Sequence, residues 1–343
     1  MIKVLGKRPS GDRQIKIADS PHYKNGEFKN IEETSVNPNK VSIVKILKDF
    51  YNRPSTVVPG KVLPSVKTDL FKLDSEIPAV VWFGHSSYMI KSAGINILVD
   101  PVFSSNASPV KFFGKAFAGS NIYGAEEIPQ VDLLLITHDH FDHLDYKTIL
   151  KLHKKVKAIV VPLGLGAHLE YWGVDRNKIT ELDWWNGHHT DSGIEITATP
   201  ARHFSGRSLK RATSLWTSYV LRHNGKKLFI GGDSGYDNQF KIIGNKFNGF
   251  DLAFLECGQY GADWPLIHMT PEQTVQAAKD LNVDVLFPVH WSKFVLSTHA
   301  WNEPIRRLTA SAQNASQKYV TPMIGEVYSL GENCKPLHWW DFE

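Results

Sequence analysis

Short apolar runs without a helical stripe recur along the chain from about residue 78 onward. They lie at residues 78–83, 88–91, 95–100, 131–136, 158–162, 179–184, 194–200, 214–221, 227–230, 251–256 and 283–289. Apolar runs of this kind, bounded by turn residues, predict buried strands. Short turns separate the first three runs, and Asn224-Gly225 is a strong hairpin signal between two later ones. The pattern therefore predicts an antiparallel meander at the start and a hairpin near residue 224.

Segments with helical spacing of apolar residues alternate with these runs. They cover residues 145–154, 164–172, 271–281 and 302–316. Pro271 stands in the first turn of its segment, where proline is favoured. Because strands and helices alternate in both halves, we expect two stacked sheets with helices on their outer faces. The predicted fold class is α/β, a four-layer αββα sandwich.

The first 77 residues have a different character. Residues 1–40 are polar and predict little regular structure, and the proline-containing residues 54–77 predict an extended connector. Between them a short amphipathic helix is predicted at residues 41–51, with apolar residues at helical spacing: Ile43, Ile46, Leu47, Phe50 and Tyr51. The favoured interpretation is that this helix packs on the main domain, and contact with a bilayer or a lipid entrance is the alternative. We expect an N-terminal extension, residues 1–77, that packs on a main domain of residues 78–343.

The formal charge of +4 is unevenly distributed. Residues 1–77 hold 14 Lys and Arg against 9 Asp and Glu, whereas the rest of the chain is nearly neutral. A nucleic-acid-binding surface needs a dense basic face, so nucleic acid is not expected as a partner. The small basic excess favours a solvated extension, with peripheral contact to an anionic membrane surface as the alternative.

Cysteine usage and hydropathy bear on the compartment. The two cysteines, Cys257 and Cys334, do not form a metal-spaced pair, so neither a thiolate metal site nor a disulfide framework is expected. The first residues lack the apolar core of a signal peptide, and no apolar stretch has the length of a membrane span. We expect a cytoplasmic protein in a reducing environment.

The densest group of chemically active residues follows the run at 131–136. Residues 138–143 include three histidines and two acids. Side chains alternate along an extended strand end, so His138 and His140 can point to one side, and Asp142 and His143 can fold back from the following turn. Such a group would be costly to assemble without a cation between its members. Imidazole and carboxylate suit zinc first, with iron or manganese as alternatives.

Three later apolar runs also end in a single residue of ligand type. His203 follows the run at 194–200, Asp233 the run at 227–230, and His290 the run at 283–289. Each of these alone would be an ordinary polar strand end. Their repetition beside the cluster at 138–143 predicts one metal site collected from one edge of the sandwich.

The motif His-x-His-x-Asp-His at 138–143, followed in order by the three later ligand types, resembles that of the metallo-β-lactamase-fold hydrolases. The resemblance implies two zinc ions in this fold. The implied ligands of the first ion are His138, His140 and His203. Those of the second are Asp142, His143 and His290, and Asp233 would bridge the two ions.

A closer resemblance covers about residues 78–330. It is carried by Trp82-Phe83-Gly84-His85, Asp100-Pro101-Val102-Phe103, Val161-Pro162-Leu163-Gly164, Glu181-Leu182-Asp183-Trp184-Trp185, Gly231-Gly232-Asp233-Ser234-Gly235-Tyr236, His268-Met269-Thr270-Pro271-Glu272 and Val289-His290-Trp291. In these motifs the chain is similar to the N-acylphosphatidylethanolamine-hydrolysing phospholipase D family. The resemblance implies a phosphodiesterase that acts on N-acylphosphatidylethanolamine-like phospholipids or a small phosphodiester. It also implies that His268 is an additional active-site histidine. The alternative is that His268 only caps the helix that begins at Pro271.

The implied reaction is hydrolysis by a hydroxide shared between two zinc ions. Asp142 would orient the hydroxide and take its proton, Asp233 would hold the ions in register, and His268 would hydrogen-bond a phosphate oxygen or the leaving group. His85, near the site, is expected to support the ligands and not to bind metal. Two other functions stay open: a lactonase or other ester hydrolase on a small soluble, phosphorylated substrate, and a non-catalytic metal-binding or sensor protein. The oligomeric state is also left open.

Overall fold

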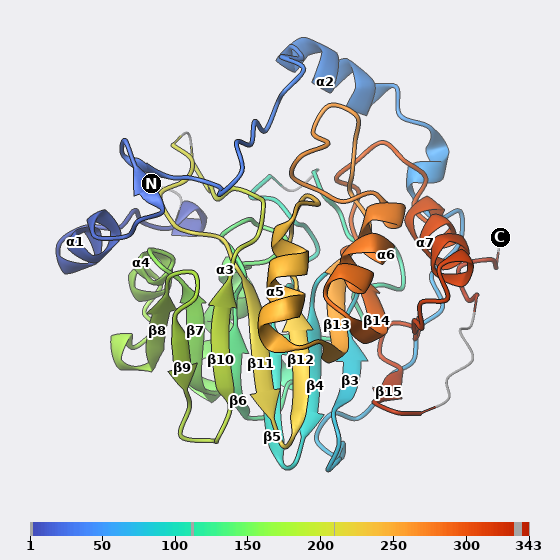
Figure 1. The fold of residues 1–343 in the computed structure, drawn as a ribbon. Helices are drawn as coiled ribbons and strands as arrows, with labels where there is room; N and C mark the ends of the chain where they lie inside the picture. Colours follow the sequence, from blue (N-terminus) through green and yellow to red (C-terminus); the bar gives the residue numbers. More distant parts are fainter. Residues whose placement is uncertain (1–2, 111–112, 209, 333–337, 343) are drawn as a thin grey trace.

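Two stacked sheets form the centre of the protein in this computed structural model, which describes residues 3–110, 113–208, 210–332 and 338–342 (Figure 1). Within these residues, the first sheet has seven strands in the order β15-β3-β4-β5-β6-β7-β8. The second has six in the order β14-β13-β12-β11-β10-β9. In Figure 1, α5, α6 and α7 cover the outer face of the second sheet, and α3 and α4 lie on the side of the first.

The bounds of the elements follow the predicted runs within a few residues. The strands of the first sheet are β3 (Ala79–Trp82), β4 (Tyr88–Ser92), β5 (Ile95–Val99), β6 (Val131–Leu135), β7 (Val156–Pro162), β8 (Ile179–Leu182) and β15 (Val327–Ser329). Those of the second are β9 (Gly187–His189), β10 (Glu195–Thr199), β11 (Ser218–His223), β12 (Lys226–Ile230), β13 (Phe250–Glu256) and β14 (Val283–Val289). The covering helices are α3 (Tyr146–Leu152), α4 (Gly166–Tyr171), α5 (Gln239–Phe247), α6 (Pro271–Asp280) and α7 (Glu303–Asn314).

The strands are apolar on both faces because both faces are covered. In β3, Val80 and Trp82 belong to the core shared with the second sheet, whereas Val81 belongs to the core that includes Ile149 of α3 and Leu169 of α4. Successive side chains of a strand point to opposite faces, so two buried faces require a nearly continuous apolar run. The predicted four-layer sandwich is confirmed.

The predicted local connections are also confirmed. β3, β4 and β5 form an antiparallel meander, and β11 pairs with β12 through a two-residue turn. Asn224 and Gly225 both have positive φ angles, of 47° and 71°, as the tightest hairpin turns require.

Within the described residues of the main domain, one α-helix and two strands were missed in the sequence: α5, β9 and β15. The two strands have three residues each and lie at sheet edges, where short polar segments carry little pattern. The helix contains Gly244, which weakens its helical signal. A Cβ atom at Gly244 would lie 2.2 Å from the Asp280 carbonyl oxygen, so this glycine allows α5 to pack closely on α6.

The expectation of little regular structure in residues 1–40 is wrong. This segment forms α1 (Asp12–Ala18) and a small hairpin of β1 (Tyr23–Lys24) and β2 (Glu27–Phe28). Ile17 and Phe28 are buried in a small core with Leu163, Trp184 and Trp216. Elements this short are stable only through tertiary packing, which the local sequence pattern does not report.

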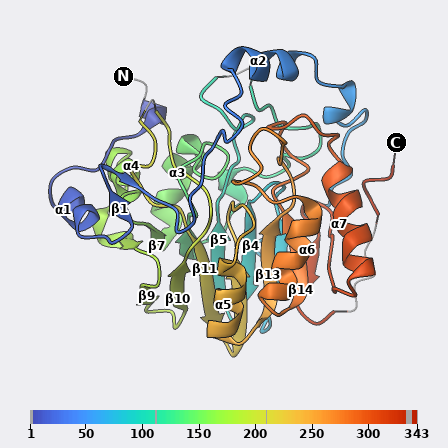
Figure 2. The same ribbon diagram turned by 45° about the horizontal axis from the view of Figure 1, so that its top comes forward.

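The helix expected at residues 41–51 is present as α2 (Ile43–Tyr51), with Ser42 as its N-cap. Both views place α2 across the end of the sandwich, apart from the other helices (Figure 2). The side chains of Ile43, Ile46 and Leu47, on which its apolar face was predicted, lie outside what the structure describes. None of the helices in the described parts of the chain is long and apolar enough to cross a membrane. Cys257 is a buried free thiol, and Cys334 lies outside the described residues.

Candidate metal centre

The strand ends singled out in the sequence meet at one edge of the stacked sheets. β12, β13 and β14 run parallel to one another, and so do β5, β6 and β7. The carboxyl ends of parallel strands lie at the same edge. Residues 138–143 follow β6 at this edge, Asp233 follows β12, His290 follows β14, and His203 joins them after β10.

The backbones of His85 and His290 tie the two sheets together at this edge. His85 follows β3 of the first sheet and His290 follows β14 of the second. The His85 N–H donates to the Trp291 carbonyl at 3.0 Å, and the His290 N–H donates to the His85 carbonyl at 3.0 Å. Both residues have positive φ angles, 54° and 66°. Residues other than glycine rarely adopt positive φ angles, and where they do, the surrounding structure holds them there. Such residues are common at functional sites.

One group of donors consists of three imidazole nitrogens and a carboxylate. His140 Nδ1 lies 3.0 Å from His138 Nε2 and 3.2 Å from His203 Nε2. Asp233 Oδ2 lies 3.7 Å from His138 Nε2 and 3.8 Å from His203 Nε2. Zinc–nitrogen bonds of about 2.0–2.1 Å place ligand nitrogens about 3–3.5 Å apart in a tetrahedral site, so this group is close to the spacing of a metal site.

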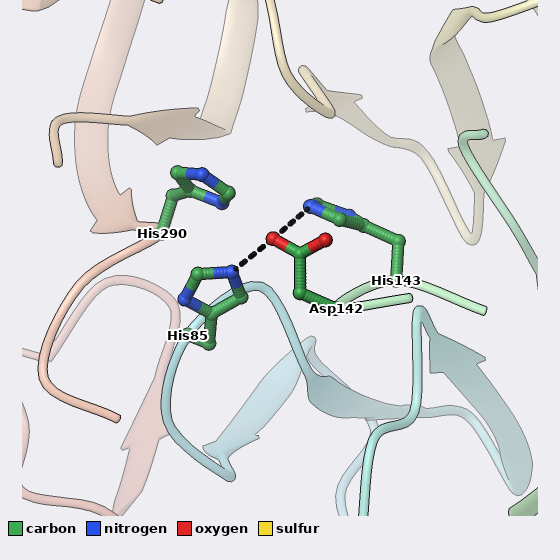
Figure 3. Close-up of side chains that lie close together, drawn as sticks. All are labelled: His85, Asp142, His143 and His290. Carbon is green, nitrogen blue, oxygen red and sulfur yellow. Dashed lines mark hydrogen bonds and ion pairs between the residues drawn. The ribbon is translucent and has the colours of Figure 1, made fainter. Parts of the chain in front are cut away.

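A second group consists of His85, Asp142, His143 and His290, whose side chains lie close together (Figure 3). Asp142 Oδ2 lies 2.9 Å from His85 Nε2 and 3.7 Å from His143 Nε2. Asp233 Oδ1 lies 3.2 Å from His143 Nε2 and 3.1 Å from His290 Nδ1. The two oxygens of Asp233 thus face different groups, and all seven residues predicted as ligands are brought together.

Hydrogen bonds on the far side of the rings orient two of the donors. Asp100 Oδ2 lies 2.8 Å from His143 Nδ1, and Asp100 is itself held by the Thr137 N–H and hydroxyl. His203 Nδ1 donates to the Ile267 carbonyl at 2.9 Å. A bond at Nδ1 sets the tautomer and leaves the Nε2 lone pair facing the centre of the site, as in many metal centres.

The electrostatics of the site favour a cation. Burial lowers the pKa values of His138, His203 and His290 well below their usual range, so these rings are neutral and offer a lone pair. Burial alone would raise the pKa of Asp233, but the neighbouring His143 holds it well below its ordinary value. His143 differs from the other rings: burial alone would lower its pKa, but Asp233 and Asp142 raise it well above the usual range. The neutral imidazoles of His138, His203 and His290 beside charged carboxylates are donors that suit zinc or iron.

Among the buried atoms without a hydrogen-bond partner in the described residues are two that point to the centre of the site. They are His143 Nε2 and Asp233 Oδ1, which face each other across 3.2 Å as an ion pair. Buried polar atoms are nearly always paired in folded proteins, so such a pair calls for an explanation. A metal ion between the two groups would satisfy both atoms, and the residues therefore fit a metal-binding site.

His268 lies beside both groups and is bonded to a buried acid. Its Nδ1 is 2.6 Å from Glu256 Oε2. Burial alone would lower the pKa of His268. The carboxylate of Glu256 outweighs this effect and raises the pKa to about 9. The alternative role as a helix cap is wrong, because the Thr270 side chain caps α6 and completes a capping box with Gln273.

A cavity of about 470 Å³ opens onto these residues. Its polar floor includes His140, Asp142, Asp233, His268 and His290. Its walls are mainly apolar and include Val36, Val41 and Phe50 of the N-terminal segment, together with Phe204, Trp264, Ile267 and Leu296. The N-terminal segment is therefore part of the site and not only a leader.

Two residues near the centre were not assigned their place by sequence reasoning. Glu256 and Asp100 were overlooked, although each ends an apolar run, as the expected ligands do. A systematic inspection of all acidic and histidine residues at strand ends would have found both. His85 was expected to support the ligands, and its Nε2 lies 2.9 Å from Asp142 Oδ2, close to the second donor group.

Residues 95–291, more than half of the chain, match the beta-lactamase superfamily domain. The chain belongs to the beta-lactamase superfamily. The chain is 36% identical to an uncharacterised protein of Mycobacterium tuberculosis over 326 residues. The aligned residues make up 94% of this chain and 87% of that protein.

Two further superfamily relatives carry informative names. The mitochondrial N-acyl-phosphatidylethanolamine-hydrolyzing phospholipase D of Saccharomyces cerevisiae is 35% identical over 242 residues, which is 68% of this chain and 51% of that protein. N-acyl-phosphatidylethanolamine-hydrolyzing phospholipase D 1 of Caenorhabditis elegans is 27% identical over 319 residues, 86% of this chain and 89% of that protein. These matches confirm the predicted family and the predicted class of enzyme, a metallo-β-lactamase-fold hydrolase.

Solved structures share the fold at low identity. A metallo hydrolase of Ignicoccus hospitalis has a TM-score of 0.56 at 20% identity, over 75% of this chain and 99% of that one. CmlA, a diiron β-hydroxylase of Streptomyces venezuelae, has a TM-score of 0.58 at 18% identity, over 76% of this chain and 55% of that one.

Proposed function

We propose that the protein is a dinuclear zinc-dependent phosphodiesterase of phospholipase D type that acts on N-acylphosphatidylethanolamine-like phospholipids. The observation that carries this proposal is the cavity, which combines a floor of metal-type donors with mainly apolar walls. This combination suits a substrate whose phosphate meets the donors while a hydrocarbon chain follows the walls. The names of the yeast and nematode relatives support the same substrate class.

In this proposal His138, His140 and His203 hold one zinc ion and Asp142, His143 and His290 hold the other, with Asp233 between them. When bound, the ions supply positive charge for an anionic phosphodiester and make water more acidic. Iron is the alternative metal, since imidazole and carboxylate also suit it. His85 orients Asp142 through the 2.9 Å contact between Nε2 and Oδ2.

The protein's own groups have distinct tasks in the proposed reaction. Burial alone would raise the pKa of Asp142, but His143 and the hydrogen bond from His85 hold it well below its ordinary value. Asp142 is therefore a carboxylate at neutral pH, and it can orient the attacking water and accept its proton. His268, in the same cavity, contacts a phosphate oxygen or the leaving group. The apolar walls limit access of further water.

Substrate entry through α2 completes the proposal. Phe50 of α2 lines the cavity, while Val44 and Tyr51 of the same helix are 71% and 90% exposed. Exposed apolar residues beside a basic segment suit peripheral contact with an anionic bilayer. In this arrangement a phospholipid would pass from the bilayer along Phe50 to the floor of the cavity.

The test compares zinc-loaded protein on vesicles that contain N-acylphosphatidylethanolamine, on a soluble aryl phosphodiester and on a panel of lactones. We expect hydrolysis of the phosphodiesters, with loss of activity in Asp233→Ala and His140→Ala. His189→Ala, at an exposed histidine of β9, should keep wild-type rates. Hydrolysis of lactones but of neither phosphodiester, or full activity after complete metal removal, would overturn the proposal.

A further inference from the structure

Glu256, the last residue of β13, is completely buried beside the metal-type donors. Its carboxylate lies within 4.8 Å of ligand atoms of Asp233, His268 and His290, so a third metal site is one interpretation of this group. The hydrogen bonds argue against it. Glu256 Oε1 accepts from the Ser234 N–H at 3.0 Å and the Met269 N–H at 3.1 Å, and Oε2 is paired with His268.

The two backbone donors belong to two different loops of the site. Ser234 directly follows Asp233 after β12, and Met269 directly follows His268 before α6. A single carboxylate therefore joins the loop that presents the central acid to the loop that presents the additional histidine. A buried acid in this position would be destabilising without such donors, so its bonds are the reason that it is tolerated.

The same carboxylate decides how the His268 ring is placed. His268 lies in the loop between β13 and α6, where no regular element orients it. Its ring stacks on His290 at 5.2 Å between centroids and lies 5.0 Å from the ring of His203. The bond from Nδ1 to Glu256 leaves Nε2 as the nitrogen that is available to a molecule in the cavity.

We propose that Glu256 is a positioning residue that holds His268 by Nδ1 and thereby presents Nε2 to the substrate. The inference rests on the proposed function in one respect, namely that His268 contacts the reacting phosphodiester. It assigns to Glu256 an effect on catalysis that is exerted entirely through His268.

A double-mutant cycle tests this assignment. Glu256→Gln keeps the side-chain volume and an oxygen for the backbone donors, but it replaces the charged partner of Nδ1. We expect kcat to fall about 100-fold in His268→Gln and about 10- to 100-fold in Glu256→Gln, the range for a lost acid–base or hydrogen-bonding group. The double variant should lose no more than His268→Gln alone, because residues that act as a unit are not additive.

Matched measurements separate positioning from a structural role. KM and the zinc content should stay at wild-type values in Glu256→Gln. Glu326→Gln is the control, since Glu326 also accepts a backbone N–H, that of Met323 at 2.8 Å, and it should keep wild-type kcat. If the losses of the two single variants multiply in the double variant, the inference is overturned.

A second readout does not depend on activity. In nitrogen-15-labelled protein, the His268 ring should give a downfield Nδ1 proton signal that is absent from His268→Gln and shifted in Glu256→Gln. Wild type and His268→Gln suffice to detect it, even where Glu256→Gln fails to fold. Absence of this signal from wild type would overturn the inference. If the wild type hydrolyses no phosphodiester, the proposed function fails, while the signal still decides whether Glu256 holds His268 by Nδ1.

Discussion

Replacement of Arg207 by methionine should weaken the whole metal centre, although Arg207 contacts none of its donor atoms. The side chain is 4% exposed, and its Nη1 donates to the carbonyls of Asp139 and Leu144, each at 2.7 Å. These carbonyls belong to the two ends of the loop that carries His138 to His143. Its Nε and Nη2 donate to the Val4 carbonyl at 3.2 and 2.9 Å, which ties the loop to the N-terminal segment.

The magnitude follows from these bonds. Methionine preserves most of the stem but leaves two buried carbonyls and the partly buried Val4 carbonyl without this donor, and each loss costs up to about 1–3 kcal/mol. Removal of a buried cation offsets part of the loss, since burial lowers the pKa of Arg207 to about 10. We expect a net destabilisation of about 3 kcal/mol. With an unfolding entropy of roughly 2.1 cal/mol/K per residue, this corresponds to a Tm lower by about 4 °C.

Thermal unfolding and zinc content, measured on the same samples, provide the assay. Arg222→Met is the matched control, because Arg222 is exposed and makes only surface contacts of the weak kind, with Glu195 at 3.9 Å and with the Phe247 ring at 5.7 Å from its centroid. Such a surface pair contributes about 0–1 kcal/mol, so the control should shift Tm by about 1 °C or less. Arg207→Met should also bind less zinc at limiting metal. An unchanged Tm with full zinc content, or equal shifts in both variants, would refute the reasoning.

Three other changes probe separate parts of the structure. Asp100→Asn removes the charged partner of His143 Nδ1 and should lower zinc affinity about 10- to 100-fold in a chelator competition; unchanged affinity would contradict the role of Asp100. Gly6 has a φ of 72°, and a Cβ atom there would lie 2.0 Å from His168 Nδ1. Gly6→Ala should therefore destabilise the folded protein by about 1–3 kcal/mol and make residues 1–10 more sensitive to protease than in wild type. Equal rates of digestion would contradict this prediction. Burial lowers the pKa of Lys293 from about 10.5 to about 7. Between these two pH values the Lys293 amine is protonated in the unfolded chain but mostly neutral in the folded protein. The unfolded chain therefore binds more protons, and the free energy of unfolding rises with pH. Lys293→Met removes this titration together with the donor to the Phe83 and Val102 carbonyls. Whatever its stability at pH 7, urea unfolding at pH 7, 8 and 9 should show the free energy of unfolding of Lys293→Met falling relative to wild type by up to about 1.4 kcal/mol per pH unit, and a constant difference would contradict this.

The strands and the ligand types could be predicted because both depend on local patterns. Runs such as 131–136 and 251–256 are mostly apolar because both faces of each sheet are buried, and a residue such as Asp233 stands out at the end of such a run. Short elements escaped because they carry little pattern of their own. α1 and the β1–β2 hairpin exist because Ile17 and Phe28 are buried against the main domain.

The amino-acid sequence by itself determined which side chains could bind a metal and at which strand ends they stand. Only the tertiary structure decided how they meet: Asp233 turns one oxygen to each donor group, and Glu256 joins the loops of Asp233 and His268. It also decided that Arg207 hydrogen-bonds both ends of the loop of residues 138–143 and that the N-terminal segment lines the cavity. The reason is physical. Periodicity reports the faces that a segment buries, whereas the partner across a buried contact depends on how distant segments pack, and that packing is a property of the whole chain.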